Sequence, residues 1–267
     1  MDIYGILAHP TKHSLSPAMH NAGFKALNLG AEYQRFDIPP EDLKQFIQRV
    51  RDEGIKGLNV STPHKENVMP LLDIIDDVAT TIGAVNTIVN KDGELHGTNV
   101  DWQGVQGAIE EVTSIEGKRA VILGAGGAAR AAVFALQRSN AAEVVILNRT
   151  MEHAKELAKE FNCKADALSS FNKYNSQIVV QATSAGMNKP EGVEIVPRES
   201  LTSEMTVMEM IYSPLETRIL KDAKDAGAKT ITGDRMLLNQ GFACFQIWTG
   251  EEAPRKEMED AIREHLN

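Results

Sequence analysis

The chain has 267 residues, which is enough for one large or two modest domains with their own hydrophobic cores. Hydrophobic residues make up 42% of it and charged residues 24%, as is typical of a soluble globular protein. The formal net charge of −9 argues against broad binding to nucleic acids or anionic membranes, so an anionic ligand must be held by a local basic or N–H-rich pocket.

The sequence carries no targeting or metal-binding signal. Cys163 and Cys244 lie far apart and fit no metal-ligand spacing, so we expect reduced thiols and no metal site. The first residues lack the basic and apolar regions of a signal peptide, and no apolar run reaches membrane-spanning length. These observations predict a cytoplasmic protein without nucleic-acid or membrane partners.

The first hundred residues alternate between strand-like and helix-like segments. Strands are predicted at Ile3–Ala8, Ala31–Asp37, Ile55–Val60, Ala84–Asn90 and Glu94–Thr98. Helices are predicted at Pro17–Leu29, Pro40–Arg51, in one or two short pieces within Pro63–Asp77, and at Asp101–Val112. Lys91-Asp92-Gly93 is typical of a hairpin between the last two strands. Ser16 is expected to cap the first helix, with Pro17 at its first position.

The rest of the chain repeats strand-helix-strand units. Strands are predicted at Ala120–Leu123, Glu143–Leu147, Gln177–Gln181, Thr206–Glu209 and Lys229–Thr232. Helices are predicted at Ala128–Gln137, Glu152–Phe161, Glu216–Ala226, Met236–Thr249 and Pro254–Leu266. The alternation predicts an α/β protein with two domains, and we expect the last two helices to pack back on the first domain.

The most informative motif is a glycine-rich turn between a predicted strand and a predicted helix. It consists of Gly124, Ala125, Gly126, Gly127 and Ala128. Glycine lets the backbone approach a pyrophosphate, and the free N–H groups at the helix start favour its negative charge. A turn that binds nothing is the weaker interpretation, because the whole strand-turn-helix-strand unit is present.

The residues that follow the next predicted strand indicate which dinucleotide, NAD(H) or NADP(H), is bound. Asn148, Arg149 and Thr150 stand about 20 residues after the turn, where an NAD enzyme usually has an acidic residue for the ribose 2′-hydroxyl. A guanidinium at Arg149 suits a 2′-phosphate instead. The sequence therefore predicts NADP(H) as the cofactor.

Polar clusters follow the predicted strands of the first domain. Ser14 and Ser16 flank a helix start and could bind a carboxylate, although Ser16 alone could be an ordinary cap. Lys65 is expected at a helix start, where the positive end of the helix dipole disfavours the charged ammonium. Such a lysine can exchange a proton with a ligand. The alternative is an ordinary solvated lysine at the surface. Asp101 is either an N-cap or a partner of Lys65, and the sequence alone does not bring the two together.

Taken in order, these motifs resemble the shikimate dehydrogenase family over nearly the full chain. The matching segments begin at Ser14 (with His20 and Asn21), Asn59, Ala84, Gly97, Gly124, Asn148, Ala182 and Gly233. The resemblance implies reversible reduction of 3-dehydroshikimate to shikimate with NADPH, on the route to chorismate and the aromatic amino acids. It implies an N-terminal α/β substrate domain with a mostly parallel sheet, formed by residues 1–101 and completed by residues 238–267. It also implies a Rossmann-like NADP-binding domain formed by residues 102–237. A monomer or homodimer is expected.

The resemblance also implies roles for individual residues. Lys65 matches the catalytic lysine, and Asp101 matches the aspartate beside it. Substrate-binding positions are matched by Ser14, Ser16, Asn59, Ser61, Asn86, Tyr212 and Gln240. The pyrophosphate turn is matched by Gly124, Ala125, Gly126, Gly127 and Ala128, and the 2′-phosphate site by Asn148, Arg149 and Thr150. Thr183, Met187, Gly233 and Met236 match positions along the nicotinamide half.

The chain departs from the family pattern at several positions. The departures are Ser61 for Thr, Thr62 for an apolar residue, Val100 for Thr, Gln181 for Asn and Glu209 for Asp. They bear on substrate preference and kinetics rather than on the reaction class. Three other functions stay open: a quinate/shikimate dehydrogenase of broader range, a non-catalytic NADP-binding relative, and a folate-type dehydrogenase, which has no need of the paired serines.

Overall fold

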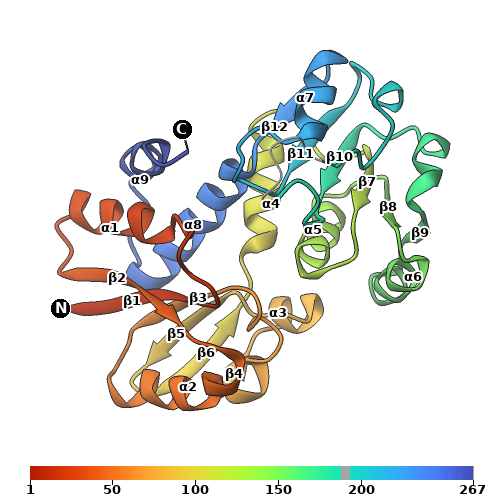
Figure 1. Ribbon diagram of the computed structural model, residues 1–267. Coiled ribbons are helices and arrows are strands. Elements are labelled where there is room, and N and C mark those ends of the chain that lie inside the picture. Colours follow the sequence, from red (N-terminus) through yellow and green to blue (C-terminus); the bar gives the residue numbers. More distant parts are fainter. Residues whose placement is uncertain (188–192, 267) are drawn as a thin grey trace. The chain divides into compact units, whose positions relative to one another are not determined.

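The computed structural model describes residues 1–187 and 193–266 of the chain. These residues form two compact units, whose elements are labelled in Figure 1. The first unit is built mainly from residues 1–100 and 240–265, and the second mainly from residues 101–239. Among the described residues, no helix is both long and apolar enough to span a membrane.

The first unit contains a six-stranded sheet in the order β2-β1-β3-β5-β6-β4. Its strands are β1 (Asp2–Ala8), β2 (Ala31–Asp37), β3 (Gly57–Val60), β4 (Ile74–Ile75), β5 (Thr87–Lys91) and β6 (Glu94–Thr98). Strand β5 runs antiparallel to β3 and β6, and the other neighbours are parallel. Asp92 and Gly93 have φ values of 52° and 98°, the positive values that a two-residue hairpin turn requires. The predicted hairpin is therefore confirmed.

Helices cover both faces of this sheet. Helix α2 (Leu43–Asp52), preceded by the 3₁₀ turn η1 (Pro40–Asp42), packs Phe46 and Val50 against Leu58 of β3. The other face is covered by α1 (Ser16–Ala26) and the second half of α8 (Gly233–Thr249), and α9 (Arg255–Arg263) packs on α1. There the Phe24 and Phe245 rings of α1 and α8 lie 5.4 Å apart. The C-terminal helices thus return to the first unit, as the sequence predicts.

The second unit contains a fully parallel sheet in the order β12-β11-β10-β7-β8-β9. Its strands are β7 (Arg119–Leu123), β8 (Glu143–Asn148), β9 (Lys164–Ala167), β10 (Ile178–Gln181), β11 (Thr206–Glu209) and β12 (Lys229–Ile231). This is the Rossmann order, in which the chain direction across the sheet reverses between β7 and β10. Ligands of such sheets bind at the carboxyl ends of the strands beside that reversal.

Alternate residues of these strands face two hydrophobic cores. Val144 and Ile146 of β8 join one core with α4 (Asp101–Glu110), α5 (Gly127–Arg138) and α6 (Met151–Glu160). Val145 and Leu147 join the other core with α7 (Arg218–Asp225) and the 3₁₀ turn η3 (Leu168–Lys173). A further 3₁₀ turn, η4, spans Arg198–Ser200. Burial on both faces explains why the strands read as continuous apolar runs.

The start of the first helix differs from the prediction. Ser16 is the first residue of α1 and not its cap, and Leu15 holds the cap position with helical backbone angles and no side-chain cap bond. The Ser14 hydroxyl oxygen instead accepts the N–H of Ser16 at 3.3 Å. The prediction that Ser16 caps this helix was wrong, because the helix starts one residue earlier than predicted and Ser16 is already its first residue.

No helix begins at Lys65, contrary to the sequence prediction. The segment around it is a series of turns, followed by the 3₁₀ turn η2 (Met69–Leu71). The Lys65 carbonyl accepts the N–H of Val85 at 2.9 Å, so it is turned toward the sheet rather than along a helix axis. The helix-dipole argument for Lys65 therefore does not apply.

Among the strands and α-helices of the described residues, β4, β9 and α3 (Asp77–Ile82) were not predicted, and neither were the 3₁₀ turns η3 and η4. Strands β4 and β9 are partly exposed edge strands of two and four residues, too short for a hydrophobic period. Helix α3 is bounded by local signals instead: Asp76 accepts the N–H of Ala79, and Gly83 ends the helix with a φ of 74°.

Candidate active site

Backbone hydrogen bonds gather the polar segments of the first unit at one edge of its sheet. Val60 donates to the Asn86 carbonyl at 2.7 Å, and Asn86 donates to the Thr98 carbonyl at 3.1 Å. The bond from Val85 to the Lys65 carbonyl attaches the lysine segment to the same place. The end of β3, the start of β5, the end of β6 and the Lys65 turn are therefore neighbours.

Two hydroxyl groups lie at the start of α1. Ser14 is half-buried and Ser16 is buried. Arg35 donates to the Ser14 carbonyl at 2.9 Å and so holds the serine segment against β2. The arrangement presents two hydroxyls at the positive end of a helix dipole, a setting that suits a carboxylate.

A buried chain of hydrogen bonds fixes the two asparagines of this edge. The Tyr33 hydroxyl donates to Oδ1 of Asn59 at 2.7 Å, and Nδ2 of Asn59 donates to Sγ of Cys244 at 3.0 Å. The same sulfur lies 3.1 Å from the hydroxyl of Thr87, which donates to Oδ1 of Asn86 at 2.8 Å. Tyr33, Thr87 and Cys244 are members of this network that were not predicted from the sequence. The one signal for Cys244 is its spacing of four residues from Gln240 on one helix face.

The hydrogen-bond network extends to Gln240 and to Val100. The Cys244 thiol lies 3.8 Å from Oε1 of Gln240. The N–H of Val100 donates to Oδ1 of Asn86 at 2.8 Å, which fixes the residue directly before Asp101. Asp101 is the buried first residue of α4 and belongs by its contacts to the second unit.

The predicted residues of the first unit divide into a buried and a partly exposed set. Asn59, Asn86 and Gln240 are buried within the network, whereas Ser61 and Lys65 are partly exposed. Such a division suits an edge that holds a polar ligand with amides from beneath and leaves the ammonium accessible to it.

A neutral aromatic layer backs this edge. The His20 ring stacks on Tyr33 with centroids 4.6 Å apart and is fully buried. Burial lowers the pKa of His20 to about 3, so the imidazole stays uncharged at physiological pH. His20 thus acts as an aromatic support for Tyr33 rather than as a proton carrier.

The glycine turn of the second unit lies between β7 and α5 and has the shape of a phosphate cradle. Gly124 has a φ of 115°, and a Cβ there would stand 2.9 Å from Cγ2 of Thr183. A Cβ at Gly126 or Gly127 would meet nothing within 4 Å. Helix α5 has no side-chain cap bond. The turn therefore offers open space in front of a helix N-terminus, which fits a pyrophosphate.

The end of β8 fits the adenosine end of a dinucleotide. Asn148 is partly exposed, and Arg149 and Thr150 are exposed. Nδ2 of Asn148 donates to the Thr150 carbonyl at 2.9 Å and shapes the turn into α6. That helix also begins without a side-chain cap bond. An exposed guanidinium beside such a helix start suits a phosphate.

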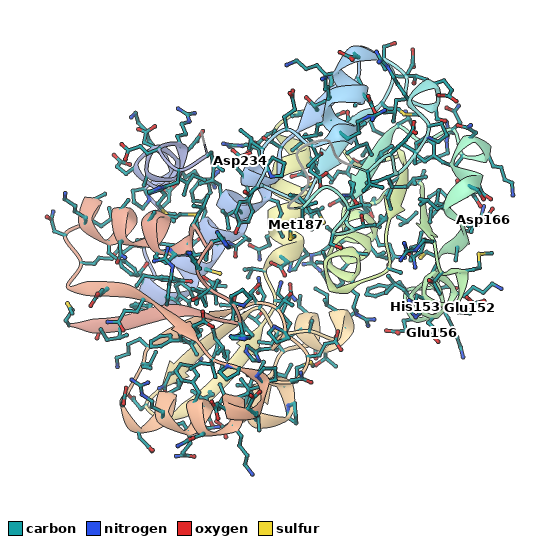
Figure 2. All side chains as sticks on the ribbon, viewed as in Figure 1. Glu152, His153, Glu156, Asp166, Met187 and Asp234 are labelled. Atoms are coloured by element: carbon teal, nitrogen blue, oxygen red, sulfur yellow. The ribbon has the colours of Figure 1, made fainter. Side chains whose placement is uncertain are left out.

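The loops after β10 and β11 meet at a buried carboxylate. Nε2 of Gln181 lies 3.3 Å from Oε1 of Glu209, and Thr217 donates to Oε2 of Glu209 at 2.7 Å. The loop after β10 carries Thr183 and the exposed Met187, which is labelled in Figure 2. The loop after β11 carries the partly buried Tyr212, whose pKa burial raises.

The start of α8 packs closely on the loop after β11. A Cβ at Gly233 would stand 2.3 Å from the Ile211 carbonyl oxygen, so no larger residue fits there without a shift. Met236 follows one turn later and packs, partly buried, against the core of the second unit. The predicted cofactor positions of the second unit thus lie on the turns that follow β7, β8 and β10 and on the first turn of α8.

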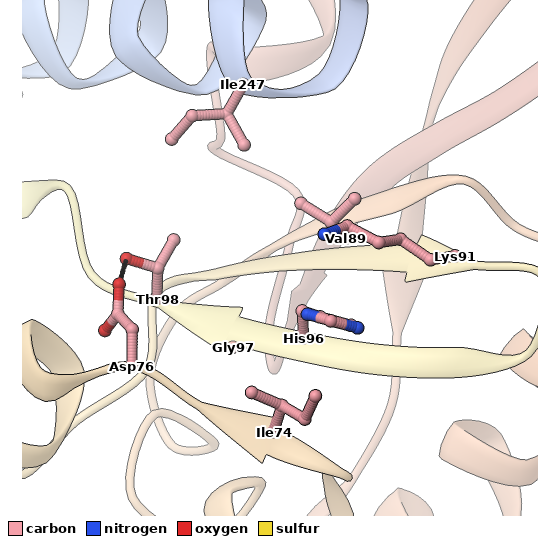
Figure 3. Close-up of a pocket in the computed structure, with 8 residues that line it drawn as sticks. All are labelled: Ile74, Asp76, Val89, Lys91, His96, Gly97, Thr98 and Ile247. Atoms are coloured by element: carbon pink, nitrogen blue, oxygen red, sulfur yellow. Dashed lines mark hydrogen bonds between the residues drawn. The ribbon is translucent and has the colours of Figure 1, made fainter.

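A separate hollow of about 270 Å³ lies on the first unit between β4, β5, β6 and Ile247 of α8 (Figure 3). Its lining includes Ile74, Val89 and His96, with Thr98 donating to Asp76 at 2.5 Å. The predicted site residues are absent from this lining. The hollow therefore shares Thr98 with the polar edge but contains none of the residues predicted to bind the ligand.

Comparison with known proteins gives matches in three segments. Residues 6–88 match the shikimate dehydrogenase substrate binding domain, residues 106–207 the shikimate / quinate 5-dehydrogenase family, and residues 235–263 the shikimate 5′-dehydrogenase C-terminal domain. An NADP(+) shikimate dehydrogenase of Methanocaldococcus jannaschii is 45% identical over 271 residues, which cover 97% of this chain and 95% of the relative. The chain belongs to the shikimate dehydrogenase family.

Solved structures of the family match nearly the whole fold. A shikimate dehydrogenase crystallised with NADP⁺ is 43% identical, covers 100% of this chain and 96% of its own, and has a TM-score of 0.95. The Thermus thermophilus shikimate dehydrogenase crystallised with NADP(H) and shikimate is 37% identical, covers 100% of both chains and has a TM-score of 0.94. The α/β fold with a Rossmann unit is thus that of the family.

Two departures from the family pattern turn out to be in contact. Gln181 and Glu209 are paired across β10 and β11, and their side chains approach each other. Val100, a third departure, is buried and uses its backbone N–H to fix Asn86. That bond is available to any residue other than proline at this position.

Proposed function

We propose that this protein is an NADP-dependent shikimate dehydrogenase, which reduces 3-dehydroshikimate to shikimate with NADPH and also catalyses the reverse reaction. The observation that carries the proposal is that one chain combines the polar edge of the first unit with the phosphate cradle and exposed Arg149 of the second, each at the family's motif positions. Its place is in the synthesis of chorismate and the aromatic amino acids.

The residues of the second unit fit NADP(H). Gly124, Gly126 and Gly127 would hold the pyrophosphate with backbone N–H groups, together with the neighbouring Ala125 and Ala128. Arg149 would bind the 2′-phosphate, with Asn148 and Thr150 beside it. Thr183, Met187, Gly233 and Met236 would line the nicotinamide half. When bound, NADP(H) supplies or accepts the hydride.

The residues of the first unit would bind the substrate. Ser14 and Ser16 would hold the carboxylate, and Asn59, Ser61, Asn86 and Gln240 would bind the ring hydroxyls, with Tyr212 from the second unit. The hydrogen-bond network through Cys244 fixes the two asparagine amides before the ligand arrives. Fixed partners of this kind lower the barrier, because little orientation is left to be lost on reaction.

Lys65 would carry the proton chemistry. Negative charge grows on the ketone oxygen during reduction, and the ammonium of Lys65 stabilises that charge and gives the oxygen its proton. In the reverse direction Lys65 takes the proton back from the hydroxyl. Asp101 would accept a hydrogen bond from the neighbouring substrate hydroxyl and orient Lys65. A relative that only binds NADP would need neither group, which argues against the non-catalytic alternative.

We also propose a cytoplasmic monomer or homodimer that acts on a small molecule. Cys163 and Cys244 are both free thiols, as proteins of a reducing compartment keep them. Sedimentation of the purified chain distinguishes the two oligomeric states.

The reverse reaction distinguishes shikimate from quinate as the substrate. Formation of NADPH is followed with shikimate and NADP⁺, and with quinate and either NADP⁺ or NAD⁺. We expect kcat/KM for shikimate with NADP⁺ to be at least ~10-fold above every quinate combination. Equal or faster turnover of quinate would replace the proposal with a quinate/shikimate dehydrogenase, and no turnover of either would contradict it.

A further inference from the structure

The strands β10 and β11 end on two buried polar side chains that no proposed role uses. Gln181 is the last residue of β10 and Glu209 the last of β11, and the two are direct neighbours in the sheet register. Both are fully buried. They lie at the carboxyl ends of parallel strands, which is the side at which such sheets bind their ligands.

The Glu209 carboxylate holds the loop that follows its own strand. Oε1 accepts the N–H of Ile211 at 2.9 Å, and Oε2 accepts the hydroxyl of Thr217 at 2.7 Å. Tyr212, the proposed substrate residue, lies between these two anchors. The loop from 210 to 217 is therefore tied at both ends to one side chain.

The Gln181 amide holds the loop that follows β10. Its Oε1 accepts the N–H of Thr183 at 2.6 Å, and its Nε2 donates to the carbonyls of Thr183 and Ala185 at 3.2 and 3.1 Å. The same Nε2 lies 3.3 and 3.4 Å from the two oxygens of Glu209. One amide therefore joins the loop carrying Thr183 to the carboxylate that fixes the loop of Tyr212.

Close packing extends this connection to the rest of the candidate cofactor site. A Cβ at Gly186 would stand 3.5 Å from Cγ2 of Thr217, which brings the two loops into contact. Thr183 in turn lies against Gly124 of the phosphate cradle, since its Cγ2 would stand 2.9 Å from a Cβ there. A displacement of Gln181 or Glu209 would thus reach the residues proposed for the nicotinamide, but it would leave Arg149, in the turn that follows β8, in place.

A buried carboxylate is a costly way to fill this space. Burial raises the pKa of Glu209 to about 7, although hydrogen bonds from Ile211 and Thr217 oppose the rise. An apolar pair of similar volume is often as stable as a buried polar one. We therefore attribute to this buried pair the role of holding the two loops rather than that of stabilising the fold.

We propose that Glu209 and Gln181 form a positioning pair, which fastens the loops after β10 and β11 to each other and so orders the surface that receives the nicotinamide half of NADP(H). This inference rests on the proposed function. The pair acts through Thr183 and Tyr212 and does not touch the reacting atoms.

The test compares two ligands that share the adenosine end. NADPH contacts the whole proposed site, whereas adenosine 2′,5′-bisphosphate reaches only the cradle side and Arg149. The dissociation constants of both are measured for Glu209→Gln, which removes the charge and one acceptor at nearly constant volume. We expect the constant for NADPH to rise about 10-fold, equivalent to 1.4 kcal/mol. The bisphosphate meets the pair only through the contact of Thr183 with Gly124, so its constant should rise no more than about 3-fold.

Two further variants complete the experiment. Asp222→Asn is the matched control, because Asp222 is a buried carboxylate of the same unit whose partner, Arg218, lies on its own helix at 2.7 Å. It should change neither constant by more than 2-fold. Thr217→Val removes one bond to Glu209 while the carboxylate stays, so it should weaken NADPH binding in the same direction, by about 3-fold.

The outcomes distinguish a failure of the positioning proposal from a failure of the proposed function. If Glu209→Gln and Thr217→Val leave NADPH binding unchanged, or if both ligands weaken equally, the positioning pair is contradicted. A wild-type protein that binds neither ligand would contradict the proposed function instead. Selective loss of NADPH in both variants, with the control unchanged, is the result that the proposal requires.

Discussion

Nδ2 of Asn59 donates a hydrogen bond to Sγ of Cys244 at 3.0 Å, although the two residues are 185 positions apart. The last long helix of the chain thus sets the orientation of an amide at the end of β3. Because the sulfur also contacts Thr87, the same atom connects the two asparagines proposed for the substrate ring. A cysteine expected only to be a reduced thiol thus lies at the centre of the polar edge.

Cys244→Ala should therefore raise KM for 3-dehydroshikimate several-fold and change kcat less. The physical reason is the loss of a buried hydrogen bond of about 1 kcal/mol at Asn59. Cys244→Ser, which keeps a donor and an acceptor, should recover most of the effect. Steady-state kinetics provide the measurement, with Cys163→Ala as the control in the second unit. Equal KM values for the alanine variant and the wild type would show that the network does not position Asn59.

Much of this architecture can be predicted from the sequence. Apolar runs such as Val144–Leu147 identify strands buried on both faces, and the glycines at Gly124 and Gly126 identify the turn that follows β7. The reason is that each signal is local: a strand, a turn and a helix start are determined by residues next to one another. Asp92-Gly93 predicts its hairpin for the same reason.

Features that depend on distant contacts could not be predicted. The turn at Lys65 forms because its carbonyl bonds to Val85, a partner 20 positions away. The contact between Gln181 and Glu209 requires knowing that β10 and β11 are neighbours, which their spacing in the chain does not reveal. The contact between these two departures from the family pattern can therefore be recognised only when the order of the strands in the sheet is known.

Lys65→Ala should lower kcat by roughly 10²- to 10⁴-fold, the usual contribution of a positioned proton donor. The dissociation constants of shikimate and NADP⁺ should change by only a small factor, because proton donation acts in the transition state. Rapid mixing and ligand titration measure the two quantities. Lys91→Ala, on the exposed hairpin, is the control and should behave like the wild type. A Lys65→Ala variant with nearly normal kcat would remove Lys65 from the mechanism.

The double variant Ser14→Ala, Ser16→Ala should raise KM for 3-dehydroshikimate with little change in kcat, since carboxylate binding is the same in the ground and transition states. A substrate analogue with an amide in place of the carboxylate should bind the wild type more weakly than the substrate does. The two serine substitutions should weaken binding of this analogue little further. Fully additive losses would mean that these serines do not bind the carboxylate.

Glu209 should give the folded protein a pH dependence that Glu209→Gln lacks. Its pKa rises from 4.5 to about 7 on folding, because burial outweighs its hydrogen bonds. The folded state therefore holds the proton more tightly. The resulting stability is present below pH 4.5 and is lost as the pH rises through 7, by about 3 kcal/mol.

Denaturant unfolding at pH 5 and pH 8 measures this contribution. Between the two values, the wild type should lose about 2.5 kcal/mol more free energy of unfolding than Glu209→Gln, because part of the effect is already lost at pH 5. Parallel pH profiles for the two proteins would show that Glu209 does not change its protonation on folding in this range.

The central claim is NADPH-dependent reduction of 3-dehydroshikimate, with Arg149 as the group that binds the 2′-phosphate. The most direct measurement is kcat/KM for 3-dehydroshikimate with NADPH and with NADH, in the wild type and in Arg149→Ala. A charge-assisted hydrogen bond contributes about 1.5–3 kcal/mol, so the wild type should prefer NADPH by roughly 10- to 100-fold. Arg149→Ala should lose most of this preference while its rate with NADH stays nearly unchanged. A wild type that uses NADH as well as NADPH, or a variant that loses both equally, would contradict the account.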